Sequence, residues 1–332
     1  MKLTANIGEL RMRETPGPES KVIEVYPEGT SFKDLGEVSD FTTRIQLRGI
    51  QFDEPWLKVE APDGKQGWIY GGALNFDLNE GNGHLSTQLI DKRLQTLFGK
   101  DQKDRINLYR QHFQEATQAK DVAAVYREGI AIIEAINKVL EGKFNHLDLE
   151  KMPDLFWLQQ CVPGFIPQLV AEGTEYMLFE DYRQWLPLAK ATDSKVDDQY
   201  FELCASAYRE DSIHYFFPAW TIQTWDYGGH SLLGEGIHLE ILTAANQNLQ
   251  NDTLFKPELI NIKSKVVKDI TENYTTFWEP QEAILSEMDS LLARNLQILT
   301  KNDKVALNVR RQQFTEPLKH QIQVNHRAGI YD

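Results

Sequence analysis

The chain has 332 residues, of which 41% are hydrophobic and 25% charged, so a soluble globular protein of two or more domains is expected. No run approaches the ~18 apolar residues that a membrane span needs. The 49 acidic residues outnumber the 35 basic ones, for a net charge of -14, and no basic stripe is present that could bind a phosphate backbone. A nucleic-acid partner is therefore not expected.

The first eighty residues alternate short strand-like segments with turns. The predicted strands are 10–13, 22–25, 30–35, 43–47, 56–59 and 67–70. Pro16-Gly17 and Asp63-Gly64 mark two of the turns, because proline fixes one backbone dihedral and glycine accepts a positive one. Five or six short strands at this spacing predict a small closed barrel.

The same segments, in the same order, resemble a known family. The matching pieces are Leu10 to Arg13 with Pro16-Gly17, then Lys21-Val22-Ile23, Gly29-Thr30, Trp56, Lys58-Val59, Asp63-Gly64 and Gly67-Trp68-Ile69. Over about residues 5–78 the chain is similar to the bacterial Src-homology-3-like domain. Agreement across roughly sixty residues is more specific than any one of the short pieces. One departure is a longer segment between Gly36 and Pro55, where the family often has a short loop.

The resemblance implies a binding module, since members of this family are mostly binding domains, often on exported proteins that touch the cell wall. A binding groove of that kind would use aromatic rings, and the candidates are Tyr26, Trp56, Trp68 and Tyr70. The alternative is that some of these rings fill the barrel core. The long segment before Pro55 is expected to shape any groove, because long loops often do so.

A polar, glycine-bearing segment at residues 79–83 is the predicted linker between domain 1–78 and domain 84–332. Beyond it the apolar residues recur every three or four positions. The predicted helices are 84–98, 103–119, 121–142, 154–172, 174–190, 197–210, 231–249, 258–278 and 285–299. The predicted fold class is thus multidomain α+β: a small Src-homology-3-like β-barrel followed by a larger all-α domain.

Residues 156–227 are unusually rich in aromatic side chains. The densest part contains Phe217, Trp220, Trp225 and Tyr227, close to a proline and two glycines. Large rings fill helical cores, which is the first interpretation. The second is a pocket for a sugar or a peptide at a helix junction.

The sequence contains none of the common catalytic signatures. Cys161 and Cys204 lie in helical, apolar contexts that favour buried free thiols, and neither matches the motif of a cell-wall cysteine peptidase. Nucleophile-elbow, phosphate-loop and zinc-helix motifs are also missing.

The only suggestive metal-ligand pattern is a pair of acid–histidine spacings, Asp211 with His214 and Glu235 with His238. A spacing of three puts each pair on one helix face, and facing pairs can hold metals in helical bundles. Bundles of that kind need two further glutamates, which nothing in the sequence singles out. The pattern is also common by chance in acidic helical chains.

Together these observations predict a non-catalytic bacterial binding or accessory protein without a cofactor. Its barrel would contact peptide, peptidoglycan or another envelope protein, and its helical domain would act as a scaffold. The alternative is a metal-dependent enzyme with its site on the helical domain. The expected location is extracytoplasmic, with a targeting segment removed; the alternative is cytoplasmic.

Overall fold

The structure, a computed structural model, describes residues 2–47, 50–76, 84–144, 155, 157–170, 173–208, 217–223, 229–273 and 276–326. The chain forms two compact units, one of Met1–Gln114 with Glu128–Phe179 and one of Glu115–Arg127 with Glu180–Asp332. The predicted linker at 79–83 lies outside the described residues, so that boundary stays a prediction. Each unit is described by itself.

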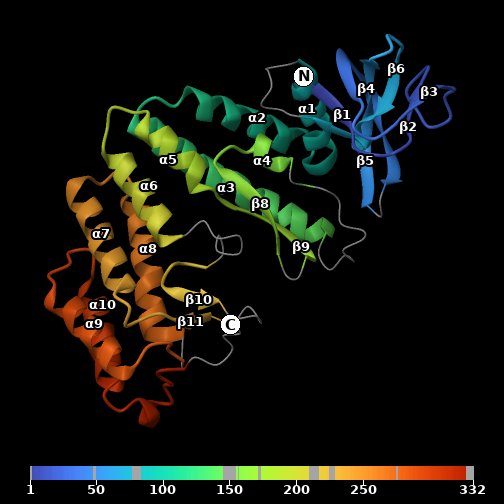
Figure 1. The fold of residues 1–332 in the computed structure, drawn as a ribbon. Helices are drawn as coiled ribbons and strands as arrows, with labels where there is room; N and C mark the ends of the chain where they lie inside the picture. Colours follow the sequence, from blue (N-terminus) through green and yellow to red (C-terminus); the bar gives the residue numbers. More distant parts are fainter. Residues whose placement is uncertain are drawn as a thin grey trace. The chain divides into compact units, whose positions relative to one another are not determined.

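An antiparallel, curled sheet opens the first unit (Figure 1, blue). Its strands are β1 (Lys2–Ala5), β2 (Leu10–Arg13), β3 (Val22–Tyr26), β4 (Ser31–Leu47), β5 (Ile50–Glu60), β6 (Gln66–Tyr70) and β7 (Leu74–Phe76). Their order in the sheet is β3-β2-β6-β5-β4-β1-β7. The predicted closed barrel is corrected to a half-barrel, because β7 is three residues long and pairs with β1 rather than with β3.

The core of the sheet is made by the alternating apolar residues that the sequence pattern indicated. Leu10 and Met12 on β2, and Leu57 and Val59 on β5, are fully or almost fully buried. Gly67 lets β6 approach β2: a Cβ at this position would lie 2.6 Å from Met12 Cγ. The glycine before Trp68 therefore serves close strand packing.

The predicted strands 30–35 and 43–47 are parts of one long strand, β4, which pairs with β5. The register shifts between Asp34 and Val38 and again between Val38 and Thr42, so β4 carries two bulges. The segment that departs from the family pattern is thus a long bulged hairpin.

Helices and a second, small sheet complete the first unit. They are α1 (His84–Phe98), α2 (Lys100–Glu115), α3 (Ala119–Phe144), α4 (Leu158–Cys161), β8 (Phe165–Val170) and β9 (Glu175–Glu180). The first residues of α3, up to Arg127, belong to the second unit. Gly129 on α3 packs so closely that a Cβ there would lie 2.4 Å from the ring of Phe165 on β8.

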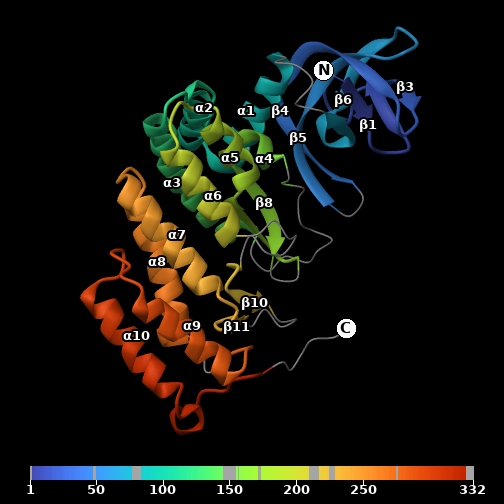
Figure 2. The same ribbon diagram turned by 60° about the vertical axis from the view of Figure 1, so that its left-hand side comes forward.

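The second unit contains α5 (Tyr182–Lys190), α6 (Val196–Ala207), β10 (Thr221–Gln223), β11 (Gly229–Ser231), α7 (Ile237–Asn251), α8 (Lys256–Lys268), a π-helical turn (Asp269–Asn273), α9 (Gln281–Ala293), α10 (Lys301–Gln313) and a short 3-10 turn (Pro317–His320). Stacked rings join its helices. Tyr200 on α6 stacks on Phe255 at a centroid distance of 4.1 Å, and Trp185 on α5 stacks on Phe201 at 5.4 Å. Figure 2 shows α7 beside α8, and α9 beside α10.

The prediction of an all-α region after residue 84 was wrong, because two two-stranded sheets interrupt the helices. Segments 154–172 and 174–190 contain β8 and β9. The residues of β8 favour strands, and Gly164 and Gly173, both with positive φ, bound the strand on either side. The region is mostly helical. In the part of the chain that the structure describes, none of the helices has the length and apolar character needed to cross a membrane.

Candidate functional site

The four aromatic rings proposed for ligand contact in the sheet lie largely in its core. Trp56 is 2% exposed, and Tyr26 and Tyr70 are also buried, whereas Trp68 is half-buried. Trp56 Nε1 donates a hydrogen bond to Thr43 Oγ1 at 2.9 Å, so its polar edge is satisfied. Of the two interpretations, the packing favours core rings. Their role in binding stays a prediction.

A different aromatic side chain of the sheet reaches the surface. Phe41, on the second bulge of β4, is 43% exposed. Ser39 holds this bulge, because its Oγ donates to the carbonyl oxygen of Phe41 at 2.6 Å and accepts from the backbone N–H of Trp56 at 2.9 Å. The backbone N–H of the buried Trp56 thus helps to fix the bulge on which the exposed Phe41 lies. Bulges often re-aim side chains at binding sites.

Phe41 lines a groove of about 700 Å³ in the first unit. The other lining residues are Val38, Asp40 and Thr42 from β4, Asp91, Lys92, Gln95 and Thr96 from α1, and Lys103 from α2. Two acidic and two basic side chains leave the groove without net charge. An exposed ring among charges of both signs can bind an apolar side chain and hydrogen-bond the polar groups next to it. The sequence indicated that the long segment would shape a groove, but not that Phe41 would lie in it.

The proposed aromatic pocket of the helical region is described only in part. Trp225 and Tyr227 lie outside the described residues. Trp220 is buried and its ring lies 6.0 Å from that of Tyr208, while Phe217 is half-buried. Trp220 therefore belongs to the core of the second unit, and the pocket stays a prediction.

The two acid–histidine pairs do not form a described metal site. Asp211 and His214 lie outside the described residues. Glu235 precedes α7, whose N-cap is Gly236, so Glu235 and His238 do not share a helix face as the spacing predicted. Across the described ranges, no three His, Cys, Asp or Glu side chains are grouped so that they could hold a metal ion.

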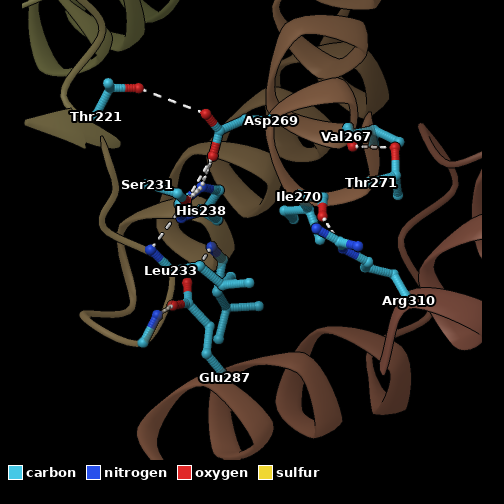
Figure 3. Close-up of polar contacts among 12 residues, drawn as sticks. Thr221, Ser231, Leu233, His238, Val267, Asp269, Ile270, Thr271, Glu287 and Arg310 are labelled. Atoms are coloured by element: carbon cyan, nitrogen blue, oxygen red, sulfur yellow. Dashed lines mark hydrogen bonds and ion pairs between the residues drawn. The ribbon is translucent and has the colours of Figure 1, made fainter. Parts of the chain in front are cut away.

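His238 instead belongs to a buried cluster with Ser231 of β11 and Asp269, the first residue of the π-helical turn (Figure 3). Its Nε2 lies 2.8 Å from Asp269 Oδ2, and Ser231 Oγ donates to the same oxygen at 2.7 Å. His238 is 0% exposed, and Ser231 and Asp269 are also buried. Sequence reasoning missed this cluster because Asp269 is 31 residues from His238, and no local pattern links them.

The geometry of this cluster differs from that of a Ser-His-Asp triad. In a triad the serine and the aspartate contact opposite ring nitrogens of the histidine. The aspartate orients the histidine ring, and the serine hydroxyl gives its proton to the ring. Here Ser231 Oγ and Asp269 Oδ2 both lie next to Nε2, at 3.4 and 2.8 Å. Nδ1 is buried and has no hydrogen-bond partner in the described part of the chain. The contacts therefore connect β11, α7 and the π-helical turn that follows α8.

A second buried acid, Glu287 of α9, supports the same segment (Figure 3). Its Oε2 accepts from the backbone N–H groups of Gly234 and Gly236, at 2.6 and 2.9 Å, and its Oε1 accepts from that of Leu239 at 3.0 Å. A carboxylate at this position satisfies the N–H group of Leu239 in the first turn of α7 and two N–H groups of the segment before the helix, and it interacts favourably with the helix dipole. Glu287 thus acts as the cap that α7 lacks in its own sequence, where Gly236 is the N-cap.

Both cysteines are buried and free, as the sequence indicated. Burial raises the pKa of each thiol to about 12, so neither is a thiolate at neutral pH.

Comparison with known proteins yields no matching family, no matching curated protein and no matching solved structure.

Proposed function

We propose that the protein is a non-catalytic binding protein and that the groove between the β4 bulge and α1 takes a peptide ligand. The observation that carries the proposal is Phe41: a 43% exposed ring, held outward by a hydrogen-bonded bulge, in a groove of ligand size. Exposed aromatic side chains in a concave surface are common anchors for peptides.

The N-terminal sheet is proposed to be a bacterial Src-homology-3-like domain. The motifs quoted above support this, and so does a curled antiparallel sheet followed by helices. On this basis the ligand is a peptide of the cell wall or of an envelope protein, and the protein acts outside the cytoplasmic membrane. Ligand source and location rest on the resemblance, whereas the groove rests on the structure.

The binding test uses the full chain and soluble peptides released from purified peptidoglycan. Phe41→Ala removes the anchor, and the loss of about 2 kcal/mol expected for a central aromatic contact corresponds to roughly 30-fold weaker binding. Val25→Ala is the matched control, since Val25 is an exposed apolar residue of the same sheet that does not line the groove. Titration calorimetry measures both variants.

Equal affinity of the Phe41→Ala variant and the unmodified protein would show that the groove is not the binding site. If neither protein binds wall peptides, the proposed ligand class is wrong. Cell fractionation tests the location separately.

A further inference from the structure

A second cavity, of about 580 Å³, is lined by the last turns of α3 and the start of β9, within the first unit. This volume is in the range of small-molecule sites, roughly 300–1,000 Å³. Its apolar lining consists of Leu140, Phe144, Tyr176 and Met177. It shares no lining residue with the groove beside β4.

The two walls of this cavity are held at a fixed spacing. Asn137 of α3 donates its Nδ2 to the carbonyl oxygen of Leu178 at 3.1 Å and accepts from the N–H of Leu178 at 2.8 Å. The side-chain amide thus bonds β9 as a neighbouring strand would. Tyr176 and Leu178 are buried, which anchors the strand further. These contacts fix the distance between α3 and β9, and with it the width of the cavity.

The charged lining indicates which ligand would fit. Glu134, Glu141 and Glu175 contribute three carboxylates and Lys138 one ammonium group, which gives a charge of about -2. In the described part of the chain, none of these four side chains forms an ion pair or hydrogen bond. An alkyl chain can pack on the apolar wall, while carboxylates next to it attract positive charge and the aromatic rings can face a cation.

We propose that this cavity binds an aliphatic amine with two or more ammonium groups, with its methylene chain on the apolar wall and its ammonium groups at the glutamates. The site is independent of the proposed peptide groove, so the failure of either proposal leaves the other standing.

The experiment titrates the full chain with spermidine by calorimetry. We expect one saturable site, weakened roughly two- to fivefold by Glu175→Gln and strengthened by a similar factor in Lys138→Gln, as for single exposed charge pairs. Raising the salt concentration weakens binding through screening. The diol 1,8-octanediol, which has an alkyl chain and no charge, is expected not to bind detectably.

The matched control is Glu19→Gln, which removes an exposed carboxylate outside the cavity and leaves spermidine affinity unchanged. This control is essential because a protein of net charge -14 attracts polyamines without a site. Equal weakening by Glu19→Gln and Glu175→Gln would overturn the proposal. So would non-saturable binding, or binding of a lysine-rich peptide but not of spermidine. Equal thermal unfolding of the variants confirms that each is folded.

Discussion

The ion pair between Arg93 of α1 and Glu54 of β5 is buried, with 8% and 9% of the side chains exposed and an Nε–Oε2 distance of 2.6 Å. Removing one partner of a buried ion pair takes away the opposite charge that offsets the desolvation of the other, which costs about 3–5 kcal/mol. We therefore expect Arg93→Met to lower the free energy of unfolding by that amount, as measured by urea denaturation.

Two further variants distinguish the buried charge from a general effect of substitution. Adding Glu54→Leu to Arg93→Met should restore most of the stability, because replacing both charges by apolar groups is often close to neutral. Lys58→Met breaks the exposed pair with Glu37 and should cost less than about 1 kcal/mol. A larger loss for Lys58→Met than for Arg93→Met would contradict the argument.

At the candidate sites, individual residues were the feature that the sequence predicted least well. It selected Trp56 because of the family pattern, yet strand pairing places this ring inside the sheet. It passed over Phe41, whose exposure depends on a bulge that local sequence does not reveal. It singled out His238 but paired it with Glu235, whereas the contact is with Asp269 on another helical segment. Such contacts arise from tertiary packing and leave no short-range pattern.

At the scale of elements, α10 depends on one aspartate. Asp303 forms a capping box with Thr300 and accepts a hydrogen bond from the buried Lys263 of α8 at 2.8 Å. Burial raises the pKa of Asp303, but the hydrogen bonds from Lys263 and Thr300 outweigh it, so the pKa lies below the ordinary aspartate value. The Asp303 carboxylate therefore binds a proton less readily in the folded state than in the unfolded state.

It follows that Asp303 stabilises the protein at pH values above the unfolded aspartate pKa, about 3.9, and that this contribution is lost as the pH falls further. Asp303→Asn removes the contribution at every pH. The difference in unfolding free energy between the two proteins should thus shrink as the pH is lowered from 6 to 3, by denaturant titration. A difference that stays constant over this range would show that the carboxylate is not responsible.

Some helices were predicted with nearly correct bounds, whereas the periodic segment 285–299 was wrong at its end, because α9 ends at Ala293. Helix α1 has the predicted bounds, 84–98, and α3 extends the predicted 121–142 by two residues at each end. The β8–β9 sheet was missed because its apolar, aromatic segments are too short to distinguish a strand from a buried helix by period alone. Gly164 and Gly173 were the available signal for turns.

At the scale of the whole molecule, α3 is the element that both units share. Tyr126, in its first half, packs on Trp185 of the second unit, at a ring distance of 5.1 Å. Ile132, Ile136 and Leu140, in its second half, are buried within the first unit. The part of α3 in the second unit, residues 119–127, is shorter than the ~12–15 residues that an isolated helix needs to be marginally stable in water, whereas the part in the first unit, residues 128–144, is longer. Loss of the first unit should therefore destabilise the start of α3, on which the second unit depends.

The two cysteines allow this coupling to be measured, since Cys161 lies in the first unit and Cys204 in the second, and both are buried. Neither thiol should react with iodoacetamide in the native protein, because burial shields it and raises its pKa to about 12. If α3 couples the units, both cysteines become reactive at the same urea concentration, as site-resolved mass spectrometry would show. Ala131→Pro, near the middle of α3, should break the helix and separate the urea midpoints at which the two cysteines become reactive. Separate midpoints in the unmodified protein would mean that the units unfold independently in spite of their common helix.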